Sequence, residues 1–500
     1  MHRWLSPIVP CCLLALLTAC APGPDFVRPT APRVTRYTDK PIPQTAAAPG
    51  KAGASQTFTP VSALPAAWWH VFHAPALDQL VRMALKNSPG LVQSEATLAE
   101  AQATLEADVD SALYPAVTGN LSAERIRNSP ATFGIPGAKA NEFNLYNASV
   151  NVTYSIDTSG GARRTLEALR AQVRYQSYEL AAARLALTAN VITTAIQAAS
   201  LQAQVQATRQ VLVAEQRALS IIQQQFALGG IAQAGVLTQE TAVAQVSASL
   251  PTLEAQQSRA RHALALLTGQ LPASAKLPPI HLRAIHLPPA LPLTLPSSLV
   301  RQRPDVRAAQ ALLHVASAEV GVAAAAELPQ LNLSASYGSG STTVSGLFTG
   351  PTMLWNAAAG LVTPIFNGGA LRAKRRGAEA AYKAASGAYR VAVLTAFQNV
   401  ADALRALEFD AASLAAQSQA AHAAKIALHL TRAQRRFGGV SVLALLTAEQ
   451  QYQQTQIALI QARAARLADT AALYQALGGG WWATRQEQRI STAHSRNRRP

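Results

Sequence analysis

The chain has 500 residues, of which 49% are hydrophobic and only 14% are charged, so it contains enough apolar residues for a large buried core. The formal net charge is +17. The positive residues are spread along predicted helices without interleaved aromatic residues, and their densest cluster is the tail at 485–499, so we exclude a nucleic-acid-binding protein. No apolar run of 18 or more residues follows the N-terminal segment, which argues against a membrane-spanning helix.

The N-terminus is typical of a lipoprotein signal peptide, which we place at residues 1–19. His2 and Arg3 supply positive charge, residues 5–17 are largely apolar, and small residues precede Cys20. The order Leu-small-Ala-Cys resembles a bacterial lipobox, so we expect Cys20 to be lipidated; signal cleavage beside an incidental cysteine is the alternative. Ala21, where an Asp would favour the inner membrane, favours the outer membrane. Residues 20–76 would then form a lipidated extended segment without disulfides.

The first half of the mature chain, residues 77–270, is predicted to contain a helix, two strands and a helical hairpin. The strands lie at about 113–125 and 143–157. In the second strand the even-numbered residues 146–156 are apolar and the odd-numbered residues 147–157 are polar. Such alternation over ten or more residues is typical of a transmembrane barrel strand, and a soluble sheet over a core is the alternative for any single strand.

The predicted hairpin at about 161–270 is unusually long. No proline interrupts residues 161–228, and apolar residues recur at steps of three, four or seven, including Leu212 and Leu219 in the first helix and Val236 and Val243 in the second. At 1.5 Å per residue the first helix would be roughly 100 Å long. This length is typical of a coiled coil or helical tube. Pro251 should kink the second helix.

The second half of the chain repeats the first. A Pro-rich linker at 271–295 precedes residues 296–479, in which strands are predicted at about 328–338 and 352–367 and a hairpin at about 370–479. A basic tail at 480–500 is predicted to be disordered. The period near 210 residues is too long for a solenoid unit and therefore indicates an internal duplication.

The number of predicted strands has a consequence for assembly. Four strands cannot close a membrane barrel, for which about eight is the practical minimum. Open edges in lipid would leave backbone groups unpaired, at several kcal/mol each. If these strands cross a membrane, several copies must therefore share one barrel, and three copies would supply twelve strands.

Four motifs in fixed order carry a resemblance to a known family. They are Gly23-Pro24-Asp25-Phe26-Val27-Arg28-Pro29, Trp68-Trp69-His70-Val71-Phe72, Arg303-Pro304-Asp305-Val306-Arg307-Ala308-Ala309 and Pro364-Ile365-Phe366-Asn367-Gly368-Gly369. With these motifs the chain resembles the TolC-like outer-membrane efflux channels, specifically the NodT-type lipoprotein subset, over residues 17–482.

The resemblance implies an α+β membrane protein in the cell outer membrane. Three chains would form a 12-stranded β-barrel, continued by a periplasmic α-helical coiled-coil barrel with a mixed equatorial region. The homotrimer would conduct drugs or other toxic compounds passively, with a periplasmic adaptor protein and an inner-membrane pump of the resistance–nodulation–division type as partners. A type I protein-secretion channel is the alternative; it usually lacks the lipidated cysteine. A periplasmic coiled-coil scaffold would leave the alternating strands unexplained.

Function is expected at the turns of the hairpins, where such a tube narrows and meets its adaptor. The glycines of these turns are Gly229, Gly230, Gly235, Gly438 and Gly439, and the sequence predicts a second turn two residues shorter than the first. The resemblance implies a gate with an Asp and, three residues later, an Arg; the matching positions here are Thr447 and Gln450. Closure would then use Glu449, Glu240, Arg435 or Arg436, or would be looser.

The sequence contains no catalytic set. We find no His-Glu-x-x-His, paired CxxC, phosphate loop or nucleophile elbow, and the ten histidines show no metal-binding spacing. We therefore expect neither an enzyme nor a bound cofactor or metal. Arg163, Arg164 and the basic run 372–376 follow the exit strands of the two halves; they are expected to contact anionic lipid headgroups or simply to face solvent.

Overall fold

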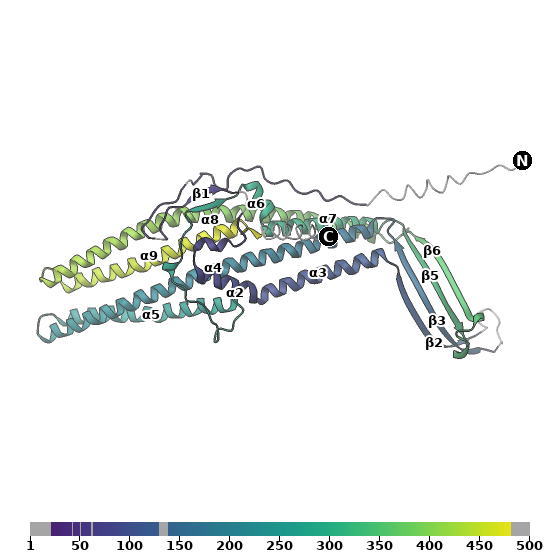
Figure 1. The fold of residues 1–500 in the computed structure, drawn as a ribbon, viewed down its shortest axis with the longest axis horizontal. Helices are drawn as coiled ribbons and strands as arrows, with labels where there is room; N and C mark the ends of the chain where they lie inside the picture. Colours follow the sequence, from purple (N-terminus) through teal and green to yellow (C-terminus); the bar gives the residue numbers. More distant parts are fainter. Residues whose placement is uncertain (1–21, 43, 51, 62–63, 130–138, 482–500) are drawn as a thin grey trace, which may run out of the picture. The chain divides into compact units, whose positions relative to one another are not determined.

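The structure is a computed structural model that describes residues 22–42, 44–50, 52–61, 64–129 and 139–481 (Figure 1). The predicted signal peptide, Cys20 and most of the basic tail lie outside these residues. The chain divides into two compact units. Unit 1 contains the residues up to Pro29, Thr97–Gln176 and Ala308–Tyr389, and unit 2 contains Thr30–Ala96, Ser177–Arg307 and the residues from Arg390 onward.

Unit 1 contains a four-stranded antiparallel sheet in the order β2-β3-β5-β6 (Figure 1). Its strands are β2 (Ala116–Asn128), β3 (Asn141–Ile156), β5 (Gln330–Ser341) and β6 (Met353–Val362). The two halves of the sequence therefore contribute two neighbouring strands each. β2 and β6 are the outer strands of the sheet.

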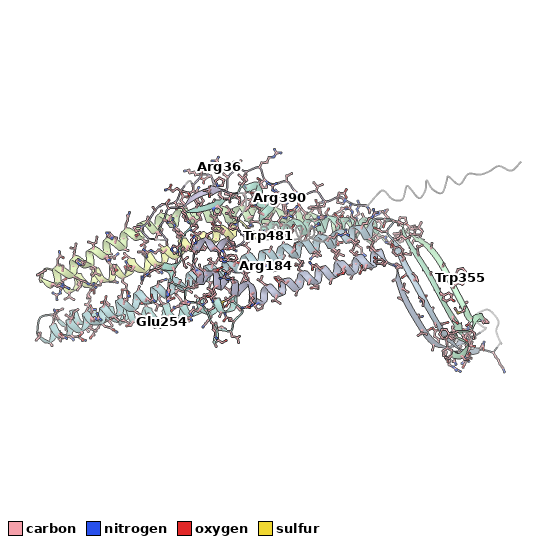
Figure 2. All side chains as sticks on the ribbon, viewed as in Figure 1. Arg36, Arg184, Glu254, Trp355, Arg390 and Trp481 are labelled. Carbon is pink, nitrogen blue, oxygen red and sulfur yellow. The ribbon has the colours of Figure 1, made fainter. Side chains whose placement is uncertain are left out.

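The register places the alternating apolar residues near the middle of β2, β3 and β5 on one face together with Trp355 of β6, while Leu354 and Val362 of β6 lie on the other face. Leu121 pairs with Ala148, Val150 pairs with Tyr337, and Tyr337 pairs with Trp355. Because successive side chains of a strand point to opposite faces, these residues share one face, and Thr118, Asn151 and Ser336 share the other. Leu121 and Trp355, which is labelled in Figure 2, are 79% and 77% exposed, so none of the residues that the structure describes covers them.

Two strand bounds differ from the sequence prediction because of proline. Leu113, expected in the first strand, is the last residue of α3 (Pro89–Leu113), and β2 begins only after Pro115. β6 ends at Val362, five residues before the predicted end at 367, because Pro364 has no N–H to donate to a ladder. Ile365 and Phe366 follow the strand and are more than 90% exposed.

The segment around Gly23 is held in unit 1 by a buried arginine. Arg164, at the start of α4 (Gly161–Ala227), donates to Pro22 O at 3.3 Å, Asp25 Oδ1 at 2.8 Å and Glu167 Oε2 at 2.7 Å. Its side chain is 6% exposed, so Arg164 neither contacts lipid headgroups nor faces solvent, contrary to both expectations. Its guanidinium instead satisfies the polar groups of the N-terminal segment, whose Phe26 ring stacks on His314 at 4.1 Å.

Glycines make this contact close. Gly23 has φ +91°, and a Cβ there would lie 2.5 Å from Gly321 Cα in α7 (Pro304–Ala325). A Cβ at Gly321 would in turn lie 2.8 Å from the Arg164 side chain. The family motif that begins at Gly23 therefore encodes a packing contact.

The long helices form two hairpins of equal dimensions (Figure 1). α4 and α8 (Ala370–Arg436) each have 67 residues, and α5 (Gln233–Leu267) and α9 (Val442–Ala476) each have 35. Equal lengths in both halves are what a duplicated unit would give. α5 continues as a helix on both sides of Pro251.

The core of unit 2 contains the aromatic motif at 68–72. Trp68 is 1% exposed and stacks on Tyr474 of α9 with ring centroids 5.3 Å apart. Phe72 is fully buried. The motif forms a short 3₁₀ helix, η1 (Trp68–Phe72), and is followed by α2 (Pro75–Asn87), in which Leu77 and Leu80 are also fully buried.

Sequence reasoning missed a small sheet in unit 2. β1 (Thr57–Pro60) pairs in parallel with β4 (Ala290–Leu293), which lies in the predicted Pro-rich linker. Four-residue strands are too short to show a period of two. At the other end of the chain, Trp481 Nε1 donates to Gln302 O at 2.7 Å, so the ordered chain continues past residue 480.

The motif at 303–309, near the start of the second half of the chain, contains another buried arginine. Arg303, between α6 (Pro296–Gln302) and α7, is bidentate to Asp305 at 2.7 and 3.0 Å and donates to Ala476 O at 3.0 Å. Pro304 occupies the first position of α7, where no N–H is needed. Arg303 thereby ties the C-terminal end of α9 to the start of the second repeat.

Two helices among the described residues, α4 and α7, pass a length-and-composition test for membrane spans, but 44% of the apolar window of each is buried within the chain. Alanine-rich helices that pack against protein pass the same test. The expectation that no helix crosses the membrane stays a prediction.

Replacing Arg303 should destabilise unit 2. Arg303→Met leaves Ala476 O and the Asp305 carboxylate without their donor, which we expect to cost about 2–4 kcal/mol. Thermal unfolding of the solubilised protein would show a lower midpoint. Arg301→Met, an exposed position two residues earlier, is the control and should leave the midpoint unchanged.

A carboxyl pair between α8 and α9 should make stability depend on pH. Burial and the neighbouring Asp410 raise the pKa of Asp469 to about 7, from an ordinary 3.8 in the unfolded chain. The folded state therefore holds this proton more tightly, and its stabilising contribution is complete below about pH 4 and is lost as pH rises through about 7. Asp469→Asn should flatten the dependence of the unfolding midpoint on pH across this window, whereas Asp402→Asn, an exposed position, should not. An unchanged slope in Asp469→Asn would contradict the assignment.

Candidate functional site

The two hairpin turns have the same length and hydrogen-bond pattern. They comprise residues 228–232 and 437–441, five residues each, so the prediction of a shorter second turn is wrong. The prediction failed because Gly235, which was expected in the loop of the first hairpin, is the third residue of helix α5.

Each turn ends its first helix with a Schellman motif. Gly229 has φ +68° and donates to Phe226 O, while the next residue, Gly230, donates to Gln225 O at 2.8 Å. Gly438 has φ +73° and donates to Arg435 O, and Gly439 donates to Gln434 O at 2.9 Å. These bonds satisfy the last carbonyls of α4 and α8 and require a left-handed residue, which glycine adopts without strain.

The turns differ in how their second helices begin. Ser441 caps α9, because its Oγ accepts from Ala444 N at 3.2 Å. Ala232 precedes α5 and offers no side-chain acceptor. Since such a cap contributes roughly 1 kcal/mol, the start of α9 is more stable than the start of α5.

Two amide contacts join the hairpins to each other. Close to the turns, Arg435 Nη2 of α8 donates to Gln225 Oε1 of α4 at 3.1 Å. Farther along, Gln461 Nε2 of α9 donates to Gln204 Oε1 of α4 at 3.1 Å. Neither contact is an ion pair, so both depend on the exact placement of amide groups.

A polar cluster lies between the four helices behind the turns. In the first hairpin, Gln239 Nε2 donates to Glu215 Oε2 at 2.7 Å and to Glu215 O at 2.9 Å. In the second, Arg432 Nη2 donates to Glu449 Oε1 at 2.9 Å. Glu215, Arg432 and Glu449 line a common cavity of about 220 Å³.

Burial and the neighbouring Glu449 disfavour a negative charge on Glu215. Burial raises the pKa of Glu215, and the nearby Glu449 raises it further, while the Gln239 hydrogen bond and Arg432 act in the opposite direction. Arg432 is the cation that acts on both carboxyls. On balance the pKa of Glu215 is raised, so this cluster favours the protonated form of Glu215 more than an exposed site would.

The predicted gate residues do not form one constellation within the chain. Thr447 is exposed, and its hydroxyl donates to Leu443 O of its own helix at 2.9 Å. Gln450, Glu240 and Arg436 are also exposed. Glu449 and Arg435 are the two predicted residues that the structure engages, each in a separate contact.

Sequence reasoning missed Glu215 and Gln239, although a signal was present. The apolar stripe steps by seven from Leu212 to Leu219, and Glu215 occupies the skipped position three residues after Leu212. Gln239 stands likewise three residues after Val236, in the step to Val243. A polar residue at a core position of a heptad pattern predicts a buried polar contact.

Within the described residues, no three His, Cys, Asp or Glu side chains are grouped in a way that could hold a metal ion. The candidate site is made of the two glycine turns and the hydrogen bonds of Arg435, Arg432 and Gln239.

The left-handed glycines should be more sensitive than their neighbours. Gly438→Ala places a side chain at φ +73°, which costs roughly 1–2 kcal/mol, and should loosen the second turn. Gly439→Ala is the matched control, because its nearest contact would be an ordinary 3.5 Å. Amide hydrogen exchange of residues 434–441 should accelerate in the first variant only; equal rates in both would refute the Schellman assignment.

Comparison with known proteins places the chain in a family. The model of the outer membrane efflux protein family matches residues 80–270 and 295–479. The pyoverdine export outer membrane protein OpmQ of Pseudomonas putida is 32% identical over 444 residues, covering 87% of this chain and 93% of that protein. Outer membrane protein OprJ of Pseudomonas aeruginosa is 30% identical over 475 residues, covering 94% and 95%.

A solved structure supports the same placement. The outer-membrane channel OprN has a TM-score of 0.80 and 29% identity, with 92% of this chain and all of that chain covered. The predicted α+β fold class is thereby confirmed, and so are the predicted outer-membrane location and efflux role. The chain belongs to the outer membrane efflux protein family and is a subunit of an outer-membrane efflux channel.

Proposed function

We propose that three copies of this chain assemble into one channel, which passively conducts drugs or other toxic small molecules from the periplasm to the exterior. The observation that carries the proposal is the sheet of unit 1. It has one apolar face that no described part of the chain covers, and two outer strands, β2 and β6, whose free edges would have to pair with neighbouring copies.

The faces of the sheet fit this role. The apolar face, with Leu121, Val150 and Trp355, would contact lipid, and the face with Thr118, Asn151 and Ser336 would line a polar lumen. Such a wet conduit offers no reacting group, so the chain would not be an enzyme. A channel of this kind selects little, and the choice of cargo would belong to the pump.

The partners in this proposal are a periplasmic adaptor protein and an inner-membrane pump, of the resistance–nodulation–division type. Gly229, Gly230, Gly438 and Gly439 expose backbone at the turns and are the proposed contact points, together with the adjoining residues. Lipidation of Cys20 would add an anchor in the outer membrane. The bonds from Arg164 to Pro22 and Asp25 support that anchor, because they hold the chain two residues beyond Cys20.

We propose that the channel is held closed by contacts that the hairpin helices make in this structure. Thr447 and Gln450 replace the Asp and Arg that the family resemblance implies, so the salt bridge between those two positions is not available. The Arg435–Gln225 and Arg432–Glu449 contacts would hold the turns instead. The Arg435–Gln225 bond involves one charge, and the Arg432–Glu449 ion pair is partly exposed, so both should be weaker than a buried ion pair and opening should need less free energy.

Charge on the apolar face should prevent insertion. Val150→Lys, near the middle of β3, should cost about 2–4 kcal/mol in the membrane, whereas Asn151→Lys on the opposite face should cost little. The fraction of chain recovered as an oligomer in outer-membrane extracts measures the difference. If Asn151→Lys were the more damaging variant, the proposed inside and outside of the barrel would be reversed.

Loss of the contact between the hairpins should open the channel. Gln225→Ala and Arg435→Ala should each raise single-channel conductance in planar bilayers, and the double variant should add nothing further, because both remove the same bond. Arg436→Ala, exposed and one residue farther on, is the control. Fully additive effects would exclude a gate made by this pair.

A further inference from the structure

A cleft of about 770 Å³ lies in unit 2 between α4 of the first hairpin and α9 of the second. The Gln204–Gln461 hydrogen bond marks where these two helices touch. Gly50 of the N-terminal segment and a short 3₁₀ helix, η3 (Leu282–Ala284), supply the remaining walls. The volume is in the range of small-molecule sites.

Two arginines that no acid neutralises face this cleft. Arg463 on α9 is half-buried, and Arg283 on η3 is exposed at the rim. Burial lowers the pKa of Arg463, and Arg283 lowers it further. Among the described residues neither guanidinium has a hydrogen bond or an ion pair. Arg463 lies next to the N-terminal segment, since a Cβ at Gly50 would be 3.8 Å from Arg463 Nη2.

Several other arginines of unit 2 pair with an acid, and the buried Arg466 donates to Ala46 O, Ala54 O and Thr45 Oγ1. Arg209 pairs with Glu254 at 2.6 Å, Arg303 with Asp305 at 2.7 Å, and Arg432 with Glu449 at 2.9 Å. Burial of Arg463 and the nearby charge of Arg283 both disfavour the charged form of Arg463, and an anion between the two guanidinium groups would offset both effects. The arrangement is therefore typical of a site whose counter-charge comes from a ligand.

The remaining lining supplies hydrogen bonds. Gln202, Gln206 and Gln210 follow one another along α4 at steps of four, and Gln456 faces the cleft from α9. Each amide offers two donors and an acceptor. A ligand held here could therefore bind both through its charge and through neutral polar groups.

We propose that this cleft binds a small organic anion of the periplasm, whose carboxylate or phosphate group lies between Arg283 and Arg463 and whose other polar groups bond to the glutamine amides. The cleft adjoins the cavity behind the turns, because Ala207, Gln210 and Gln456 line both, but Arg283 and Arg463 line the cleft and not that cavity. Because α4 and α9 belong to different hairpins, a bound anion would link the two.

Titration calorimetry of the purified full-length protein in detergent would test the proposal, with citrate and inorganic phosphate as probes and sodium chloride at matched ionic strength as the reference. We expect saturable binding of at least one probe, and the tighter of the two identifies carboxylate or phosphate as the preferred group. Arg463→Gln should weaken binding about tenfold or more, which corresponds to about 1.4 kcal/mol.

Two further variants keep the test decisive. Arg283→Gln, at an exposed position where folding should be unaffected, should also weaken binding, and Arg261→Gln, an exposed arginine of α5 outside the cleft, should bind as the wild type does. The proposal is overturned if neither probe saturates, or if Arg261→Gln loses as much affinity as the cleft variants. It also fails if no probe binds and Arg463→Gln dissociates the oligomer in native mass spectrometry, because a carboxylate of a neighbouring copy would then occupy the cleft.

Discussion

The constraint on which the rest of this structure depends is that a β-strand in lipid must have all its backbone groups paired. The sheet of unit 1 satisfies this rule for β3 and β5 and leaves the outer edges of β2 and β6 for other chains. The alternation of apolar and polar residues has a second cause: successive side chains of a strand point to opposite faces, and a barrel wall has lipid on one side and water on the other. The equal hairpins then follow from duplication, because each half of the chain brings two strands and one hairpin.

The two hairpins have the same helix lengths and the same turns, but they differ in the polar residues at their core positions. Glu215 and Gln239 occupy core positions of the first hairpin, and the positions 209 residues later in the second hairpin are Ala424 and Ala448. The second hairpin instead carries the Arg432–Glu449 pair and the Ser441 cap. Duplication thus preserved the backbone plan, while the polar contacts that fix helix register diverged.

Much of this fold could be predicted from local sequence patterns. The parity of residues 146–156 predicted the apolar face of the sheet, and uninterrupted heptad spacing with terminal glycines predicted the helices and the places where they turn. What could not be predicted depends on contacts distant in sequence. β1 and β4 are too short to show a pattern, and Arg164 is indistinguishable from a solvated helix residue until Pro22 and Asp25 are brought beside it. Pairings such as Gln225 with Arg435 join residues 210 positions apart, and no spacing rule anticipates them.

The contact between Gly23 and Gly321 has a consequence for the acyl group proposed at Cys20. With Pro22 fixed by Arg164, the modified residue can lie no more than about 7 Å away, because two residues of fully extended chain span no more. A fatty-acyl group on so short a tether could not diffuse laterally in the bilayer independently of the protein. It would instead stay close to Pro22 and act as an annular lipid that the protein carries with it.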